Sequence, residues 1–363
     1  MKKIRLGVIG TGMAWEKLHY PAVKELSDKF EIVALANRTK KDAETFAAKI
    51  NLDQANVYQD YKEMLKRKDF DAVDILVPID QNYSVSEEVA EAGINFICEK
   101  PLAPDMEQAG KYLELSRRHN LKIMIAENYR YNEENNKILK MVRERWIGDV
   151  VYFVNNNINC FPCQMTQDDT FAATEWRQHP DFPGGAFLDA ALHDLAAMRH
   201  IFGEIECVSA FGKPQKADFS PYVSVNANIL FKSGVVGQYT YFPSGNEPQR
   251  PLLGFRIFGR NGEIYLEEKS CGIINVAYND GRAEQVPYTP ERGYYNELLN
   301  FYNAFNGTEK ISVTPEIEYG DVKTVFSILE AVKSHKVVYV DRQQPPEVIA
   351  HVETAETSGN YLQ

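Results

Sequence analysis

The first 126 residues alternate short apolar runs with segments of helical periodicity. This alternation predicts a parallel sheet, because parallel strands are usually joined by helices, which then cover both faces of the sheet. The predicted strands are Ile4–Ile9, Ile32–Ala36, Ala72–Val77, Asn95–Cys98 and Lys122–Ala126. The predicted helices lie near residues 14–27, 40–50, 60–67, 84–92 and 105–119.

The pattern changes after Gly148. Val150–Asn157 alternates apolar and polar residues, and further strand-like runs follow, several of them separated by turns that carry glycine. These runs are Val208–Phe211, Val223–Phe231, Val235–Phe242, Phe255–Phe258 and Ile273–Tyr278, and helices near residues 294–305 and 315–334 follow them. We expect an α/β chain with a doubly wound parallel sheet over residues 1–127, an α+β domain with a large, mostly antiparallel sheet over 128–341, and a loosely attached polar tail over 342–363.

The formal net charge of −11 argues against broad contact with nucleic acid or with an anionic membrane surface. The sequence has no run of about 18 apolar residues, so we expect no transmembrane helix. The basic start, Met1–Arg5, resembles a signal peptide, but one short strand and a glycine turn follow it. These features predict a cytoplasmic protein.

Only Cys160 and Cys163, among five cysteines, have the spacing of a redox or metal pair. A zinc site would need a second pair or nearby histidines, and none is close in sequence. We therefore expect reduced, incidental thiols and no metal, with a functional pair as the alternative.

Gly10 and Gly12 lie in the turn that joins the first predicted strand to the first predicted helix. Gly10 allows a tight turn, and Gly12 lets the backbone approach a pyrophosphate at the helix N-terminus. The third position of this fingerprint, which normally packs the helix against the strand, is Trp15. We expect Gly10, Gly12, Met13 and Ala14 to bind a nicotinamide dinucleotide; the alternative is a glycine turn without a ligand.

Asn37 and Arg38 follow the second predicted strand. An NAD site has a carboxylate here to hold the ribose hydroxyls, whereas arginine pairs with the 2′-phosphate of NADP. Asn37 occupies the position of the acid, and Arg38 stands beside it. NADP(H) is therefore favoured over NAD(H), with a solvated Arg38 as the alternative.

Lys100 follows the predicted strand Asn95–Cys98, at the end where a parallel sheet carries its chemistry. Pro101 disfavours a helical conformation for Lys100, which fixes the direction of the side chain. Lys100 is a candidate to act beside a nicotinamide, and an exposed loop lysine is the alternative.

Asp189 and His193 lie on a loop that runs into a predicted helix. Because they are four residues apart, both lie on one face of the helix. An ordinary histidine has a pKa of about 6.5, which suits acid–base chemistry, and a nearby carboxylate can orient the imidazole or a substrate hydroxyl. The alternative is an Asp–His pair on a solvated helix.

Trp176 and Arg177 lie in a segment of mixed polarity, residues 159–183. A bound sugar could stack on Trp176 and hydrogen-bond to Arg177, and a packed surface loop with a buried tryptophan is an equal alternative.

Several motifs together resemble the glucose–fructose oxidoreductase/inositol dehydrogenase (Gfo/Idh/MocA) family. They are Gly10-x-Gly12, His19-Tyr20-Pro21-Ala22, Glu99-Lys100-Pro101, Asn128-Tyr129-Arg130-Tyr131, Gly184-Gly185-x-x-x-Asp189-x-x-x-His193 and Tyr294-x-x-Glu297-x-x-x-Phe301. The likeness runs from residue 4 to about residue 340. It implies a Rossmann domain, hydride transfer between a nicotinamide and a secondary alcohol of a sugar, cyclitol or related polyol, and assembly as a homodimer or homotetramer.

The resemblance also implies roles for individual residues. Lys100, Asp189 and His193 would be catalytic: His193 would move the hydroxyl proton, Lys100 would stabilise negative charge on the oxygen, and Asp189 would position a neighbouring hydroxyl or His193 itself. The cofactor site would include Pro78, Asn82, Glu99 and Lys100, which could also hydrogen-bond the ribose, and the substrate side would include Tyr129 and Arg130.

Two departures from the family pattern leave the substrate open. The chain reads Pro78-Ile79-Asp80-Gln81-Asn82 where the family has Pro-Asn-x-x-His, and Ala196 stands where a further aspartate is common. Two other functions use the same fold: a regulator that senses nicotinamide nucleotides without turnover, and a glycoside hydrolase or eliminase that oxidises its sugar transiently. A sensor does not need an acid–base pair, so Lys100, Asp189 and His193 favour the oxidoreductase.

Overall fold

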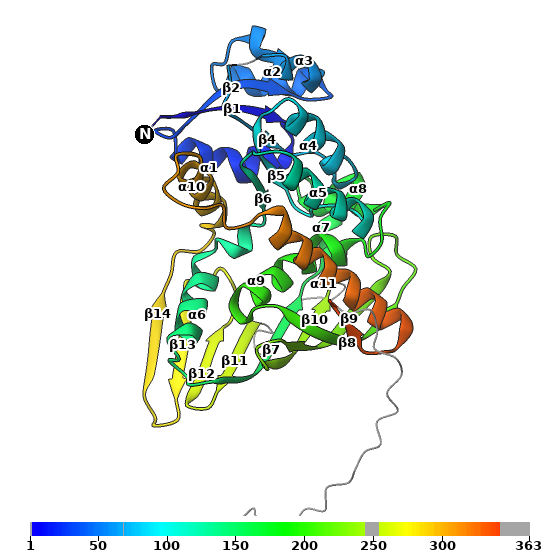
Figure 1. The fold of residues 1–363 in the computed structure, drawn as a ribbon. Helices are drawn as coiled ribbons and strands as arrows, with labels where there is room; N and C mark the ends of the chain where they lie inside the picture. The colour runs from blue at the N-terminus through cyan, green and yellow to red at the C-terminus, as the bar shows by residue number, and fades with distance from the viewer. Residues whose placement is uncertain (1, 68, 244–253, 342–363) are drawn as a thin grey trace, which may run out of the picture.

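The structure, a computed structural model, describes residues 2–67, 69–243 and 254–341, and it contains two sheets (Figure 1). The first sheet has six parallel strands in the order β3-β2-β1-β4-β5-β6. They are β1 (Ile4–Ile9), β2 (Phe30–Ala36), β3 (Val57–Tyr58), β4 (Ala72–Ile75), β5 (Asn95–Glu99) and β6 (Ile123–Ala126). Nearly every residue of these strands is buried, as expected where helices cover both faces of a parallel sheet.

The helices of this first half are those that the periodicity predicts. They are α1 (Tyr20–Glu25), preceded by a π-helical turn η1 (Trp15–His19), α2 (Lys40–Lys49), α3 (Tyr61–Leu65), α4 (Asn82–Glu91) and α5 (Met106–Arg118), with short 3₁₀ turns η2 (Gln54–Asn56) and η3 (Ile79–Gln81). Figure 1 shows α1 on one side of the sheet and α4 and α5 on the other. The predicted doubly wound sheet is confirmed, and its strand order reverses between β1 and β4, where such folds have their ligand crevice.

The second sheet has nine strands in the order β14-β13-β12-β11-β7-β10-β9-β8-β15. Only β7 and β10 pair in parallel, so the predicted, mostly antiparallel sheet is confirmed. The strands are β7 (Val150–Ile158), β8 (Ile205–Pro214), β9 (Tyr222–Phe231), β10 (Val236–Phe242), β11 (Gly254–Gly259), β12 (Gly262–Leu266), β13 (Ile273–Tyr278), β14 (Ala283–Pro287) and β15 (Val338–Tyr339).

Helices fill the space between the two sheets (Figure 1). The helices of the second half are η4 (Asn128–Arg130), α6 (Glu133–Arg143), α7 (Phe161–Met165), η5 (Phe171–Ala173), α8 (Glu175–Gln178), a π-helical turn η6 (Phe187–Ala191), α9 (Leu192–Phe202), α10 (Gly293–Phe305) and α11 (Pro315–Ser334). α11 packs on β8 of the second sheet and on α5 and β6 of the first domain. The amide of Ile125 in β6 donates to the carbonyl of Val313, just before α11, at 3.0 Å.

None of the helices in the described part of the chain is long and apolar enough to cross a membrane. The predicted tail, residues 342–363, lies outside the described residues.

Candidate active site

A cavity of about 810 Å³ opens at the carboxyl ends of β1, β4 and β5, and residues of the second half of the chain complete its walls. Its size is within the range of about 300–1,000 Å³ that is typical of ligand pockets. Gly12, Pro78, Lys100, Asp189 and His193 all line it. Residues predicted separately for the cofactor and for catalysis therefore meet in one cavity.

The glycine turn leaves room for a dinucleotide. Gly10 has a φ of 97°, and a Cβ there would collide with the carbonyl of Leu76, so the turn requires glycine. A Cβ on Gly12 would meet no atom within 4 Å, and Gly12, Met13 and Ala14 line the cavity at the start of the helix. Backbone N–H groups at a helix N-terminus bind phosphates, so this end of the cavity fits a pyrophosphate. Trp15, fully buried, packs on Phe46 and does not fill this space.

Asn37 and Arg38 lie next to the glycine turn, because β1 and β2 are neighbours in the sheet. The amide of Asn37 donates to Oγ1 of Thr11 at 2.9 Å, which ties the end of β2 to the turn. Arg38 is exposed, and no residue in the described part of the chain hydrogen-bonds or ion-pairs with it. Its guanidinium is therefore free to meet a ligand.

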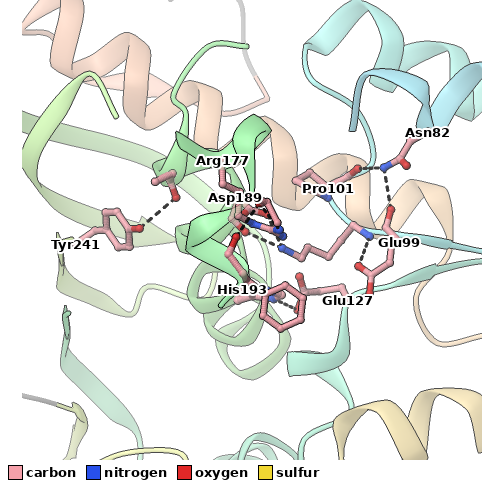
Figure 2. Close-up of polar contacts among 12 residues, drawn as sticks. Asn82, Glu99, Pro101, Glu127, Arg177, Asp189, His193 and Tyr241 are labelled. Atoms are coloured by element: carbon pink, nitrogen blue, oxygen red, sulfur yellow. Dashed lines mark hydrogen bonds and ion pairs between the residues drawn. The ribbon is translucent and has the colours of Figure 1, made fainter. Parts of the chain in front are cut away.

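Asn82 supports the loop that carries Lys100. Its Nδ2 donates to the carbonyl oxygens of Glu99 and Pro101, at 3.0 and 2.8 Å (Figure 2). Asn82 is 1% exposed and is not among the residues that line the cavity, whereas Glu99 and Pro78 line it. The amide of Asn82 is used within the protein, where it holds the loop in position, and its expected contact with the cofactor stays a prediction.

Glu99 connects Lys100 to a buried charged cluster. Oε2 of Glu99 accepts from the backbone N–H of Lys100 at 3.0 Å, and Oε1 lies 3.0 Å from Nε2 of His19, whose Nδ1 lies 2.8 Å from Asp74. Burial alone would lower the pKa of His19, but Asp74 and Glu99 outweigh it and raise this pKa well above its ordinary value. His19 is therefore a buried cation that supports Glu99, and it does not line the cavity.

Lys100 and Arg177 both contact Asp189, and Figure 2 shows Arg177 beside it. Nζ of Lys100 donates to the backbone carbonyl and to Oδ1 of Asp189 at 2.8 and 2.9 Å, and Nε of Arg177 donates to Oδ2 at 2.7 Å. Burial alone would raise the pKa of Asp189, but Arg177 and Lys100 hold it well below its usual range. Burial likewise opposes the charge on Lys100, but Asp189 and Glu99 outweigh it and raise the pKa of Lys100. All three side chains are therefore charged.

His193 is oriented by Glu127, which lies at the end of β6. Nδ1 of His193 is 2.8 Å from Oε1 of Glu127, and the imidazole stacks on Tyr129 with ring centroids 4.4 Å apart. A carboxylate beside Nδ1 favours the tautomer with the proton on Nδ1, which leaves Nε2 as the atom able to accept a proton. Of the two roles expected of Asp189, the orientation of His193 is thus taken by Glu127.

Comparison with known proteins decides the family. The model described as "Oxidoreductase family, NAD-binding Rossmann fold" matches residues 4–127, and "Oxidoreductase family, C-terminal alpha/beta domain" matches residues 139–353, both of the Gfo/Idh/MocA group. The chain belongs to the Gfo/Idh/MocA oxidoreductase family. It is an NAD-binding dehydrogenase or reductase, as the resemblance implied.

Relatives of this Gfo/Idh/MocA oxidoreductase cover nearly its whole length. An uncharacterised protein of Saccharomyces cerevisiae is 28% identical over 359 residues, which are 95% of this chain and 100% of the relative. An oxidoreductase structure from Thermotoga maritima is 30% identical with a TM-score of 0.81, covering 93% of this chain and 99% of its own. A levoglucosan dehydrogenase, solved with NADH and levoglucosan, has a TM-score of 0.82 at 20% identity, covering 94% of this chain and 100% of its own; it shares the fold.

Arg130 lies outside the cavity wall. Its Nε and Nη2 donate to Asp321 of α11 at 2.9 and 2.7 Å, and it is absent from the residues that line the cavity. A buried guanidinium needs a carboxylate partner, and Asp321, which also binds Arg199, provides it. Arg130 joins helices here, and its expected contact with a substrate stays a prediction. Tyr129, by contrast, lines the cavity.

Trp176 and Arg177 both line the cavity. The guanidinium carbon of Arg177 lies 3.9 Å from the centroid of the Trp176 ring and 5.4 Å from that of Phe171. This stacking holds the guanidinium in a fixed plane beside Asp189.

Glu127, Glu134 and Lys269 are cavity or near-cavity residues that sequence reasoning missed. Glu127 follows β6 and could have been found by the same rule that found Lys100 after β5. Glu134 lies on α6, and burial raises its pKa to about 7. Lys269 lies between β12 and β13 and donates to the hydroxyl of Tyr129 at 2.8 Å. No local sequence motif indicates that Glu134 or Lys269 lies in the cavity.

Cys160 and Cys163 form a disulfide, so the expectation of reduced thiols is corrected. The residues stand one helical turn apart at the start of α7, with Cα atoms 5.2 Å apart, within the range of about 4.4–6.8 Å that disulfides span. Within residues 2–67, 69–243 and 254–341, no group of three or more His, Cys, Asp or Glu side chains could hold a metal ion.

Proposed function

We propose that this chain transfers a hydride between NADP(H) and a secondary alcohol or ketone of a sugar, cyclitol or related polyol. The observation that carries the proposal is that Lys100 and His193, each held by its own buried carboxylate, line one cavity with the glycine turn. The levoglucosan dehydrogenase of the same fold, solved with its sugar and NADH, supports the substrate class. When bound, the nicotinamide accepts or gives the hydride at its C4 atom.

His193 would carry the proton. In oxidation, Nε2 takes the proton of the substrate hydroxyl, and in reduction a protonated Nε2 returns it. Glu127 stabilises the imidazolium that forms and keeps the ring in one orientation, and stacking on Tyr129 limits its tilt. A base fixed before the substrate arrives needs little rearrangement during the reaction.

Lys100 would stabilise the oxygen of the reacting carbon. Its ammonium is fixed by two bonds to Asp189 and has a third N–H to offer. A positioned cation in a site that excludes water stabilises the negative charge that develops on an alkoxide. Asp189 therefore acts by aligning Lys100 and Arg177, and the remaining face of its carboxylate can receive a substrate hydroxyl.

The preference for NADP(H) rests on Asn37 and Arg38. Asn37 places an amide where an acid would repel a 2′-phosphate, and its bond to Thr11 fixes the end of β2 beside the glycine turn. Arg38, exposed and unpaired within the described residues, can pair with that phosphate bidentately.

The test is a titration of the protein with NADPH and with NADH, followed by tryptophan fluorescence, since Trp15 and Trp176 both line the cavity. Oxidation of a panel of sugars and polyols with NADP+ then follows. Tighter binding of NADPH and turnover of a secondary alcohol support the proposal. Tighter binding of NADH overturns the NADP(H) assignment, and binding without turnover of any panel member overturns the substrate class.

A further inference from the structure

Two cations in the cavity share a single carboxylate. Lys100 and Arg177 lie 2.9 and 2.7 Å from the two oxygens of Asp189. Asp189 is the carboxylate that contacts both cations. The other carboxylate that raises the pKa of Lys100 is Glu99, which is itself bound to His19.

Two other cations of the cavity wall do not share a carboxylate. Lys17 pairs with Asp169 at 2.8 Å, and Arg292 pairs with Glu25 at 2.9 Å, each with a carboxylate of its own. Among these four cations, only Lys100 and Arg177 contact the same carboxylate.

Arg177 offers the outer edge of its guanidinium. Its Nε is used by Asp189, Nη1 has only a 3.5 Å contact with the hydroxyl of Thr174, and Nη2 has no partner among the described residues. The two Nη atoms form a planar fork whose spacing matches a carboxylate. Stacking on Trp176 and Phe171 fixes this fork before a ligand binds.

Lys269 is a further cation of the cavity wall. Its Nζ donates to the hydroxyl of Tyr129 at 2.8 Å, and no carboxylate in the described part of the chain forms an ion pair with it. Tyr129 in turn stacks on His193, so Tyr129 lies between Lys269 and the proposed base. It lines the same cavity.

We propose that the substrate is a sugar or polyol acid, such as an aldonate or a uronate, whose carboxylate binds the Nη edge of Arg177 while its secondary hydroxyl lies between Lys100 and His193. The inference rests on the proposed function and narrows its substrate class. The phosphates of the cofactor belong at the glycine turn, in the first domain. Arg177 and Lys269 belong to the second half of the chain and line the cavity with His193. In a chain with a net charge of −11, anion binding depends on such local groups.

The experiment compares acids with neutral partners of the same carbon skeleton. Oxidation of gluconate and of glucitol, and of galacturonate and galactose, is measured as kcat/KM with saturating NADP+. The acids are expected to be better substrates by about 10-fold or more, the value of a charge-assisted hydrogen-bond pair. Their advantage should shrink as salt is added.

Variants assign that preference to residues. Arg177→Gln should lower the acid-to-neutral ratio of kcat/KM by about 10-fold or more. Because Arg177 also contacts Asp189, its loss can lower kcat/KM for acids and neutral partners alike. Such a general loss of catalysis leaves the acid-to-neutral ratio of kcat/KM unchanged. Lys269→Met should lower the ratio as well. Because Lys269 bonds to Tyr129, which stacks on His193, the ratio and not the turnover is again the readout. Lys17→Met, a cavity lysine with its own carboxylate, is the matched control and should leave the ratio unchanged.

The outcomes separate the two proposals. A preference for acids that falls in both variants and not in the control supports the inference. Equal turnover of acids and neutral partners, or a preference that survives both substitutions, overturns the inference and leaves the proposed function in place. No oxidation of any sugar, polyol or acid with either cofactor overturns the proposed function and the inference together.

Discussion

Nδ1 of His193 lies 2.8 Å from Oε1 of Glu127, a carboxylate with no exposed surface. His193 begins α9 beside the second sheet, and Glu127 follows the last strand of the first sheet. The orientation of the proposed base therefore depends on how the two halves of the chain pack. A change that shifts one half against the other would alter the proton transfer without touching either residue.

His193→Ala should change the pH dependence of kcat, because it removes the group proposed to carry the proton. Glu127→Gln should keep the base but misorient it, so we expect kcat to fall by about 10–100-fold with a smaller change in KM. Steady-state kinetics across pH test both. A wild-type pH profile in His193→Ala would assign the proton to another group.

Lys100→Met should lower kcat by about 100–1,000-fold, the cost of losing one preorganised donor to a developing oxyanion. Cofactor binding should stay within a few-fold, because the dinucleotide is held mainly at the glycine turn. Stopped-flow turnover and fluorescence titration separate the two effects. Lys40→Met, on the exposed first turn of α2, serves as the control. Near wild-type turnover in Lys100→Met would remove this lysine from the mechanism.

Arg38→Ala should weaken NADPH by about 10-fold or more, because a charge-assisted pair with the 2′-phosphate is lost, and should change NADH by less than about 2-fold. Isothermal titration with each nucleotide measures the difference. Lys41→Ala, three residues on and also exposed, controls for a general loss of positive charge. Equal losses for the two nucleotides would show that Arg38 does not meet the phosphate.

Glu134 should make the protein less stable as the pH rises. Burial raises its pKa from 4.5 to about 7, so its contribution to stability is complete below about pH 4.5 and is lost as the pH rises through about 7. At about 1.4 kcal/mol per pKa unit, the loss is at most roughly 3.5 kcal/mol. Glu134→Gln should remove it, which urea unfolding at pH 5 and pH 8 would show. Exposed Glu114→Gln should leave the difference between the two pH values unchanged.

Asp321→Asn should destabilise the fold by about 3–5 kcal/mol, because it leaves Arg130 and Arg199 buried without their shared carboxylate. Activity per folded molecule should change little, since Arg130 and Asp321 do not line the cavity. Chemical unfolding together with kinetics on the folded fraction tests this. Asp280→Asn, which affects an exposed pair with Arg282, should leave the free energy of unfolding nearly unchanged, because solvent screens such a pair. If Asp321→Asn changed KM strongly and left stability unchanged, the result would indicate that Arg130 contributes to substrate binding.

The fold could be predicted where elements are long enough to show a period. Ile4–Ile9 and Pro315–Ser334 have the predicted bounds because each carries an uninterrupted pattern. Val57–Tyr58 has two residues and no period, and Ala283–Pro287 is a mostly exposed edge strand, so neither gives an apolar signal.

The candidate site could be predicted where a topological rule fixes a residue's location. Lys100 follows a parallel strand, and such residues face the crevice whatever their partners. The ion pair of Arg130 could not be predicted because its partner, Asp321, lies 191 residues away, and the sequence does not distinguish an arginine that binds a substrate from one that binds a helix. Lys269 enters the cavity only through the pairing of β12 with β13.

The hydrogen bond from Ile125 to Val313 has a consequence for how the enzyme can be divided. β6 is the edge strand of the cofactor sheet, and Val313 covers part of that edge from the far end of the sequence. A fragment ending at residue 127 would expose an unpaired apolar strand and would aggregate. Cofactor domains exchanged between relatives must therefore carry residues 293–334 with them, since the unit that binds the dinucleotide is built from both ends of the chain.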